Sequence, residues 1–509
     1  MASNSRSKNV ALNAGWAIIS QVVAVVLGLA SRKIFLDHLG AELLGVNSLF
    51  TDVLALFSFA DLGFGTAIMF SMYAPIANND TSKVASYLLF FKQIYRYVIA
   101  VVILISIAFI PFLSSLKTDI PIGDLRIYYL FFQIGNVLHY VWAYRESYVI
   151  ARQEERILSM ASMIYSVVCT SLLIISVLVY ESFILYLIVQ FSCIAIKKVV
   201  VNHYITRKYP ITKLEGAVPL NKEEKKSVIS KSMALLVTKI GNLAINQTDS
   251  LIVSYMINVI QWGYASTYLM LKTTIKGVAD KFYSAVLPSM GNLTSFNDKK
   301  KNLNIFLKYD FLNSWLYIFC FVGLGCLSTP FISLFFGESV TLSKSFVFFF
   351  LLAYLVDGLR SPISLLREAT GSYEVDKWYT IVAAVVNIAV SIPLAKFYGL
   401  NGVYIGTIFA MIVLHVTRTY VLFHSGEYDI TVVKYLLIVL NHVIVGVIIF
   451  FATDFVCGKV AILPNGVLSF ILQLFIVLLV PNILLIAIYR KNAYYIEYRN
   501  LIITKILKR

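Results

Sequence analysis

The sequence predicts an all-α, polytopic membrane protein with about fourteen transmembrane helices in two parallel six-helix lobes plus two C-terminal helices. Apolar residues make up 59% of the 509 residues, charged residues only 14%, and the mean hydropathy is +0.79. Soluble domains contain about 45–50% apolar and about 25% charged residues, so this composition is typical of a chain embedded in a bilayer.

Fourteen apolar stretches have the length, about 17–25 residues or more, that a helix needs to cross a bilayer. In the first part of the chain we predict spans near 9–31, 42–69, 86–113, 125–150, 157–179 and 181–204. In the second part we predict them near 229–256, 260–290, 309–336, 343–368, 376–398, 400–424, 434–454 and 465–489. The first stretch is too long for the apolar region of a signal peptide, so we expect it to remain as a helix.

The net charge of +16 follows the positive-inside rule and does not indicate a nucleic-acid partner. With a cytoplasmic N-terminus, the inner connections collect the basic residues Arg152 and Arg156, Lys197 and Lys198, and 299–301. The outer connections are short and contain few basic residues, although Arg32 and Lys33 fall on the outer side. Both termini are therefore predicted to be cytoplasmic. The five cysteines show no pairing framework.

The span at 229–256 carries a polar stripe. Lys239, Asn242, Asn246 and Asp249 follow one another in steps of three, four and three residues, so they share one helical face. A Lys or Asp at the bilayer centre costs roughly 2.5–3.5 kcal/mol on insertion scales, so this face is not expected to meet lipid. It should line an internal cavity or pair with another helix.

Self-similarity at one offset indicates the two lobes. A shift of the sequence by 218 residues aligns Gly45 with Gly263, and the same shift aligns Tyr186 with Tyr404 much further along. Six helices per repeat preserve the orientation, so the halves would be parallel repeats with the binding site between them. The predicted domains are an N-lobe at 1–206, a cytoplasmic linker at 207–227, a C-lobe at 228–426, two further helices within 427–490, and a basic amphipathic cytoplasmic tail at 491–509.

Three stretches resemble a known group of membrane proteins. The first runs from Phe35 to Asp80 and reads FLDHLGAELLGVNSLFTDVLALFSFADLGFGTAIMFSMYAPIANND; it looks like the second-helix region of Gram-positive flippases for surface polysaccharides. Two more are similar to later helices of the same superfamily, namely TDSLIVSYM at 248–256 and VNIAVSIPLAKFYGLNGVYIGTIFA at 386–410. The chain thus resembles the polysaccharide-transporter branch of the MOP superfamily, which contains the Wzx-type flippases and is related to lipid II flippases and MATE-type drug exporters.

This resemblance implies an alternating-access carrier of a bacterial cytoplasmic membrane. It would move a polyprenyl-diphosphate-linked oligosaccharide from the inner to the outer leaflet for surface polysaccharide assembly. The implied partners are this lipid-linked oligosaccharide, membrane lipids and other proteins of polysaccharide assembly. No cofactor and no catalytic residue are expected.

A diphosphate that crosses a medium of low dielectric constant needs cationic partners. Lys239 is predicted near mid-membrane, and further cations lie on the spans at 260–290 and 343–368. The predicted substrate-binding residues are Lys239, Asn242, Asn246, Lys272, Lys276 and Arg360. A plainer interpretation stays open for Lys276, which could pair with Asp280 one helical turn away.

The resemblance also implies a coupling ion, because some relatives hold sodium with an aspartate of the seventh helix and polar groups of the eleventh and twelfth. The matching positions here are Asp249, Asn387, Ser391 and Thr407. Ser391 is neutral where some relatives have a carboxylate, so Na+ and H+ both stay candidates and no metal site is assigned. A charge balance between Lys239 and Asp249 is the alternative.

Two further ionisable residues have two interpretations each. Asp61 lies beside Gly63 and Gly65 in the segment ADLGFG, where helix packing and proton coupling compete. His139 is either a hydrogen-bonded structural residue or part of a proton relay.

Three other functions compete with this one. A MATE-type exporter moves cationic drugs and should have an acidic cavity, whereas a lipid II flippase would differ mainly in its substrate. A membrane polysaccharide polymerase or ligase would be an enzyme, but such enzymes typically present a large outer loop with catalytic residues. Short outer connections, and the lack of a Walker lysine or of Cys/His metal spacing, favour a carrier that is not an enzyme.

Overall fold

The computed structural model describes the backbone of residues 2–57, 64–293, 299–370, 373–424, 428–461 and 465–507. Side chains are described for these residues except at 2–22, 66, 231, 234–239, 242, 246, 282–293, 368–370, 373–377, 502 and 505–507. The described residues form helices and turns without any strand, which confirms the predicted all-α membrane fold. Within them, ten helices are long and apolar enough to cross a membrane.

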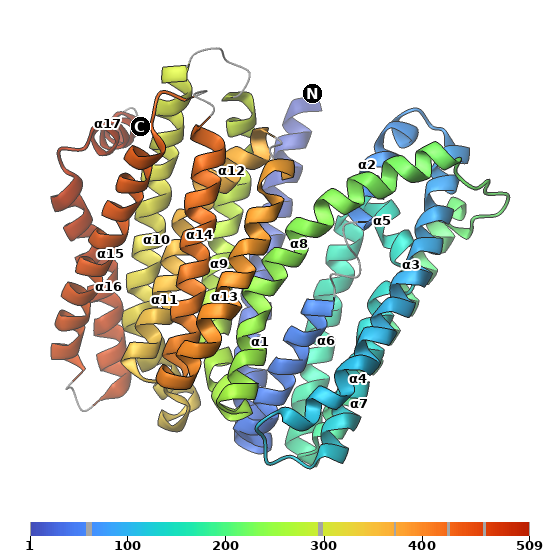
Figure 1. Ribbon diagram of the computed structural model, residues 1–509, viewed down its shortest axis with the longest axis horizontal. Coiled ribbons are helices and arrows are strands. Elements are labelled where there is room, and N and C mark those ends of the chain that lie inside the picture. The colour runs from blue at the N-terminus through green and yellow to red at the C-terminus, as the bar shows by residue number, and fades with distance from the viewer. Residues whose placement is uncertain are drawn as a thin grey trace. The chain divides into compact units, whose positions relative to one another are not determined.

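The chain divides into two compact units, Met1–Gly263 and Tyr264–Arg509. The first unit contains α1 (Ala2–Phe57), α2 (Phe64–Ala77), α3 (Thr81–Phe109), α4 (Ile122–Tyr140), α5 (Ala143–Ala151), α6 (Arg156–Tyr180), α7 (Phe183–Lys208) and α8 (Lys222–Met256). Short 3-10 helices lie at Ile110–Ser115 and Pro210–Lys213. Helices α3, α4 and α7 run side by side in this unit (Figure 1).

The second unit takes most of α9 (Val259–Leu293) and the helices that follow it. These are α10 (Lys299–Phe336), α11 (Lys344–Leu359), α12 (Ser361–Thr370), α13 (Tyr373–Tyr398), α14 (Leu400–Phe423), α15 (Val432–Val460), α16 (Gly466–Tyr489) and α17 (Ala493–Leu507), with a 3-10 helix at Glu338–Val340. Helices α15 and α16 pack against α10 (Figure 1). The boundary between these compact units falls after α8, whereas the predicted linker between the lobes lies before α8, at 207–227. The predicted lobes are defined by the sequence repeat and not by compactness, so the lobe division stays a prediction.

Helix α1 contains the first predicted span and the start of the second. The two are separated at Gly40, whose φ of 85° and ψ of 169° interrupt the helix in a conformation that glycine adopts readily. The cations that did not fit the charge pattern lie just before this break. Arg32 donates to the carbonyl oxygen of Gly263 at 3.2 Å, and Lys33 pairs with Asp37 at 2.8 Å, so both have partners within the unit.

The predicted single helix at 125–150 was wrong, because α4 ends at Tyr140 and α5 begins at Ala143. Between them Trp142 adopts a left-handed conformation with φ 59°, which stops the helix. Neither glycine nor proline marks this break in the sequence. Tyr140 and Tyr144, on either side of it, are both buried in the aromatic core of the first unit, so tertiary packing imposes the break.

The connection between α5 and α6 is held to the end of α7 by a charged cluster. Lys208 donates to Glu154 at 2.8 Å, Arg152 donates to the other carboxylate oxygen at 3.0 Å, and the Tyr209 hydroxyl donates to Glu154 as well. The hydrogen bond from Lys208, with those from Tyr209 and Arg152, lowers the pKa of Glu154 to about 2. The ionised carboxylate is therefore favoured in the folded protein.

This cluster predicts an acid-sensitive contribution to stability. Because the pKa of Glu154 is depressed on folding, its contribution is present above the unfolded-state value near 4.5 and is lost as the pH falls towards about 2. The difference in thermal unfolding midpoint between wild type and Glu154→Gln should be constant from neutral pH to about pH 5 and then shrink. A difference that is independent of pH down to about pH 3 would contradict this prediction.

The tail predicted at 491–509 contains helix α17, which packs on the second unit. The ring of Trp315 in α10 stacks on Tyr495 at a centroid distance of 6.0 Å and an interplanar angle of 6°. Lys308 pairs with Glu497, and the Tyr498 hydroxyl donates to the carbonyl oxygen of Lys308. These contacts hold α17 against α10.

Candidate functional site

A cluster of charged side chains lies inside the second unit, and its first members come from α9. Lys272, Lys276 and Asp280 follow one another at intervals of four residues and share one helical face. Lys276 Nζ lies 3.4 Å from Asp280 and 3.9 Å from the Asp357 carboxylate of α11. Lys272 Nζ lies 4.6 Å from the centroid of the Phe350 ring and also acts electrostatically on Asp357.

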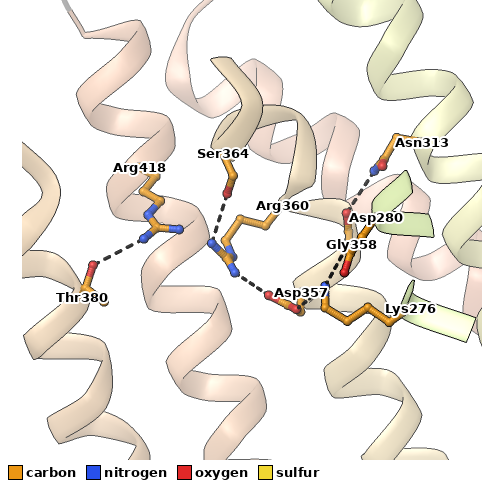
Figure 2. A network of polar contacts seen from close by, with 9 residues as sticks. All are labelled: Lys276, Asp280, Asn313, Asp357, Gly358, Arg360, Ser364, Thr380 and Arg418. Carbon is orange, nitrogen blue, oxygen red and sulfur yellow. Dashed lines mark hydrogen bonds and ion pairs between the residues drawn. The ribbon is translucent and has the colours of Figure 1, made fainter. Parts of the chain in front are cut away.

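The junction of α11 and α12 supplies the next two members. Pro362 lacks a backbone N–H and so cannot donate to the carbonyl oxygen of Gly358 four residues earlier, and the predicted span at 343–368 divides at Arg360. Arg360 pairs with Asp357 and donates to Ser364 Oγ at 3.2 Å (Figure 2). Its third nitrogen, Nε, is buried and has no hydrogen-bond partner among the described residues.

The last turn of α11 is fixed against α10. Asn313 Nδ2 donates to the carbonyl oxygen of Gly358 at 3.0 Å (Figure 2). A Cβ at Gly358 would lie 1.9 Å from the ring of Tyr317, so only glycine allows this close approach. The Asp357 carboxylate is therefore positioned by a rigid helix end and not by a loop.

The rear of the site is formed by α13 and α14. Arg418 is 2% exposed and donates to Thr380 Oγ1 at 3.4 Å (Figure 2). His415, one turn earlier on α14, is also buried and lies close enough to Arg360 and Arg418 to interact with them electrostatically. Buried polar groups thus continue from the Asp357 pair to Arg418.

We define the cationic cluster as Lys272, Lys276, Arg360 and Arg418 together with Asp280 and Asp357. Four cations and two carboxylates leave a surplus of positive charge. Exposure falls with depth: the side chain of Lys276 is 37% exposed, that of Arg360 14%, and Arg418 is almost fully covered. An anionic group can therefore reach Lys276 first, while Arg360 lies behind it beside Asp357.

The structure brings together three of the predicted substrate-binding residues, Lys272, Lys276 and Arg360. The plainer interpretation of Lys276 is also observed, because it pairs with Asp280, but it lies near Asp357 as well. The side chains of Lys239, Asn242 and Asn246, like the whole of Asp61, lie outside the described residues. Their predicted roles stay predictions.

The predicted ion-coupling residues are found in both units. Asn387, Ser391 and Thr407 meet at the crossing of α13 and α14, where Asn387 donates to Thr407 at 3.3 Å and Ser391 donates to the Val403 carbonyl at 3.0 Å. Asp249 belongs to the first unit, so its participation in this site stays a prediction. No group of three His, Cys, Asp or Glu side chains suited to a metal occurs in the part of the chain that the structure describes.

Three residues near these sites, Asp357, Arg418 and Asp52, are not among the predicted site residues. Asp357 and Arg360 are three residues apart, a spacing that places them on one helical face and could have indicated the pair. Arg418 lies near the predicted cytoplasmic end of its span, where an arginine is normally taken as a positive-inside anchor. Asp52 of α1 lies close to the buried Asp249 of α8, and no sequence pattern indicated this proximity.

Comparison with solved structures identifies the class of fold, which is that of MOP-superfamily membrane transporters. The chain matches the lipid II flippase MurJ in an inward closed conformation with a TM-score of 0.65 and 18% identity, over 93% of this chain and 98% of that one. It matches an inward-facing multidrug resistance MATE family transporter with a TM-score of 0.55 and 14% identity, over 79% and 96% of the two chains.

A third match is a mutant of the MATE transporter VcmN from Vibrio cholerae, with a TM-score of 0.55 and 11% identity, over 81% of this chain and 96% of that one. No protein-family model and no curated protein sequence matches the chain. The chain thus shares its fold with the MurJ and MATE transporters, and its long apolar helices make it a multi-pass membrane protein.

Proposed function

We propose that the protein is an alternating-access flippase that moves a polyprenyl-diphosphate-linked oligosaccharide from the inner to the outer leaflet. The observation that carries this proposal is the cationic cluster, which lies within predicted membrane spans and holds more positive than negative charge. Ionisable groups at such depth are costly and are normally retained for function. The MOP-superfamily fold supports transport as the general activity.

The cluster suits a diphosphate for two reasons. Lys276 is the accessible point charge, and lysine binds phosphate oxygens from varied directions. The buried Nε of Arg360, which has no described partner, offers a further charge-assisted hydrogen bond once a phosphate oxygen approaches. In this proposal Lys239, Asn242 and Asn246 supply a second polar face, while Asp249 with Asn387, Ser391 and Thr407 binds the coupling Na+ or H+.

Lipid II transport is the second candidate, because the MurJ match extends over nearly the whole of both chains. Its substrate has the same polyprenyl diphosphate, so the cationic cluster suits either headgroup. Export of cationic drugs is disfavoured, since a drug of positive charge would be repelled by Lys276 and Lys272.

We also infer that the protein is not an enzyme and that it acts in the bacterial cytoplasmic membrane with both termini in the cytoplasm.

The decisive experiment measures leaflet sidedness in vesicles that contain the purified protein. The compounds compared are a polyprenyl-diphosphate oligosaccharide, lipid II and a cationic dye. The appearance of the two glycans at the outer surface is followed with a membrane-impermeant glycan-modifying reagent. We expect the oligosaccharide to become accessible and the dye to remain where it was. Faster movement of lipid II would favour the second candidate, and movement of the dye alone would overturn the proposal.

Replacement of Lys276 tests its role as the exposed contact. Loss of one charge-assisted hydrogen bond, worth about 1.5–3 kcal/mol, should slow flipping by Lys276→Gln about tenfold or more. Lys276→Arg should retain most of the rate. Asp280→Asn is the matched control on the same helical face: it removes a competing carboxylate and should leave the rate unchanged or higher. Equal rates for Lys276→Gln and wild type would exclude this contact.

A further inference from the structure

A second polar cavity lies in the first unit, among α4, α5, α6 and α7. Its volume is about 220 Å³, and its polar lining consists of His139, Glu146, Ser162, Tyr165, Lys197 and Lys198. One water molecule takes about 30 Å³ in the liquid, so the cavity has room for a group much larger than a single water. None of its residues belongs to the cationic cluster of the second unit.

One part of the cavity lining is an ion pair between the buried Lys198 and the partly exposed Glu146. Lys198 lies 2.7 Å from Glu146, its side chain is only 9% exposed, and it also donates to the carbonyl oxygen of His139 at 3.1 Å. The charge of Lys198 is therefore compensated within the protein. This pair joins α7 to α5.

The rim carries a cation of a different kind. Lys197 Nζ donates to the exposed hydroxyl of Ser162 at 3.0 Å and lies 4.9 Å from the centroid of the Tyr165 ring. Its hydrogen-bond partner is thus a hydroxyl and its ring contact an aromatic face, while the Glu146 carboxylate, already paired with Lys198, acts on it electrostatically without a direct ion pair among the described residues. With two lysines and one glutamate, the lining has a surplus of one positive charge.

These contacts refine one sequence prediction for this region. The charge pattern places Lys197 and Lys198 in a cytoplasmic connection, but they lie within α7, more than two turns before its end at Lys208. His139 contributes its backbone carbonyl oxygen to Lys198, and the role of its imidazole stays a prediction.

The chemistry of the rim suits a phosphate diester. An ammonium group and a hydroxyl can together contact its two free oxygens, and one positive charge balances its single negative charge. Basic pockets between transmembrane helices on the cytoplasmic side are suited to phospholipid headgroups. The rim lies in the half of α7 that is predicted to be cytoplasmic. Ile164 of α6 and Ile196 and Val200 of α7 are about 60% exposed apolar residues on the same helices, as expected beside acyl chains.

We propose that this cavity binds the phosphodiester headgroup of an anionic phospholipid of the inner leaflet, with Lys197 and Ser162 as its direct contacts. The apolar surface of α6 and α7 would lie along the acyl chains, which favours a lipid over a soluble phosphate. This site is independent of the proposed flippase activity, because it lies in the first unit and its test measures lipid binding alone.

The test is a titration of the full-length protein in neutral detergent with phosphatidylglycerol, followed by native mass spectrometry. A lysine near a headgroup contributes about 1 kcal/mol, so Lys197→Gln should weaken the tightest bound lipid about fivefold. Lys434→Gln is the matched control, since Lys434 is an exposed lysine at the start of α15 outside the cavity. It should bind as wild type does.

A second variant keeps the test sound if Lys197→Gln does not fold. Ser162→Trp fills the rim at an exposed position without any change in charge, and it should weaken binding at least as much. Phosphatidylcholine should not replace phosphatidylglycerol, and millimolar inorganic phosphate should not displace it. Unchanged binding in both cavity variants, or displacement by inorganic phosphate alone, would overturn the assignment.

Discussion

Flipping is expected to fall about 100-fold when Arg360 is replaced by glutamine. A hydrogen-bonded charge contributes about 1.5–3 kcal/mol, and removal of Arg360 has a second effect on its neighbour. Asp357 would lose its closest cation, so its carboxylate would be drawn to Lys276, now 3.9 Å away. A single substitution would thus remove one cation and neutralise the cation that is most accessible to substrate.

The effect on transport can be separated from an effect on folding. Removal of one partner of a largely buried ion pair leaves the other charge uncompensated, so Arg360→Gln alone will also accumulate less well. The double variant Arg360→Gln/Asp357→Asn removes the unpaired carboxylate and releases Lys276. We expect it to recover stability and part of the flipping rate, measured by leaflet sidedness per molecule of folded protein.

Two further variants define the specificity of this prediction. Arg360→Lys keeps the charge but cannot bond Asp357 and Ser364 with one planar group, so its rate should be intermediate. Lys344→Gln is the control, because Lys344 is 81% exposed and pairs with Asp454 away from the cluster. Wild-type flipping by folded Arg360→Gln would show that Arg360 neither contacts the substrate nor keeps Lys276 available to it.

The cationic face of α9 could be predicted because helical periodicity is a local property. Residues four apart, such as Lys272 and Lys276, share a face in any helix that contains them. The convergence of this face on Asp357 could not be predicted in the same way. It requires the helix junction at Arg360 and the contact of Gly358 with Tyr317, and both depend on packing between helices that are distant in sequence.

The same distinction between local signals and tertiary packing explains the errors in the predicted fold. The break at Gly40 has a local signal, because glycine accepts a positive φ, whereas the break at Trp142 has none. Charge alone places Lys197 and Lys198 in a cytoplasmic connection, and composition does not reveal that Glu146 compensates Lys198 within the first unit. Membrane location thus follows from composition, while the partners of buried charges follow only from tertiary structure.

A second large effect is expected at the crossing of α13 and α14, where Gly406→Ala should destabilise the protein. Gly402 and Gly406 are one turn apart and form a GxxxG pair, which lets two helix backbones approach closely. A Cβ at Gly406 would lie 2.6 Å from the backbone nitrogen of Ser391 and 2.8 Å from its Cα. Backbone atoms cannot turn aside as a flexible side chain does, so the helices must separate.

Separation would also break the polar contacts at this crossing. The hydrogen bond from Ser391 to the carbonyl of Val403 spans α13 and α14, as does that from Asn387 to Thr407. Overpacking costs about 1–3 kcal/mol, and the loss of these buried hydrogen bonds adds to it, so the free energy of unfolding should fall by about 3 kcal/mol. The measurement is thermal unfolding of the purified protein in detergent.

Gly458→Ala is the matched control for this substitution. Gly458 also lies within a membrane-crossing helix, α15, but a Cβ there would meet no atom within 4 Å. Alanine has the higher helix propensity, so this variant should be as stable as wild type or slightly more stable. Equal unfolding midpoints for Gly406→Ala and Gly458→Ala would mean that α13 and α14 do not pack backbone to backbone at Gly406.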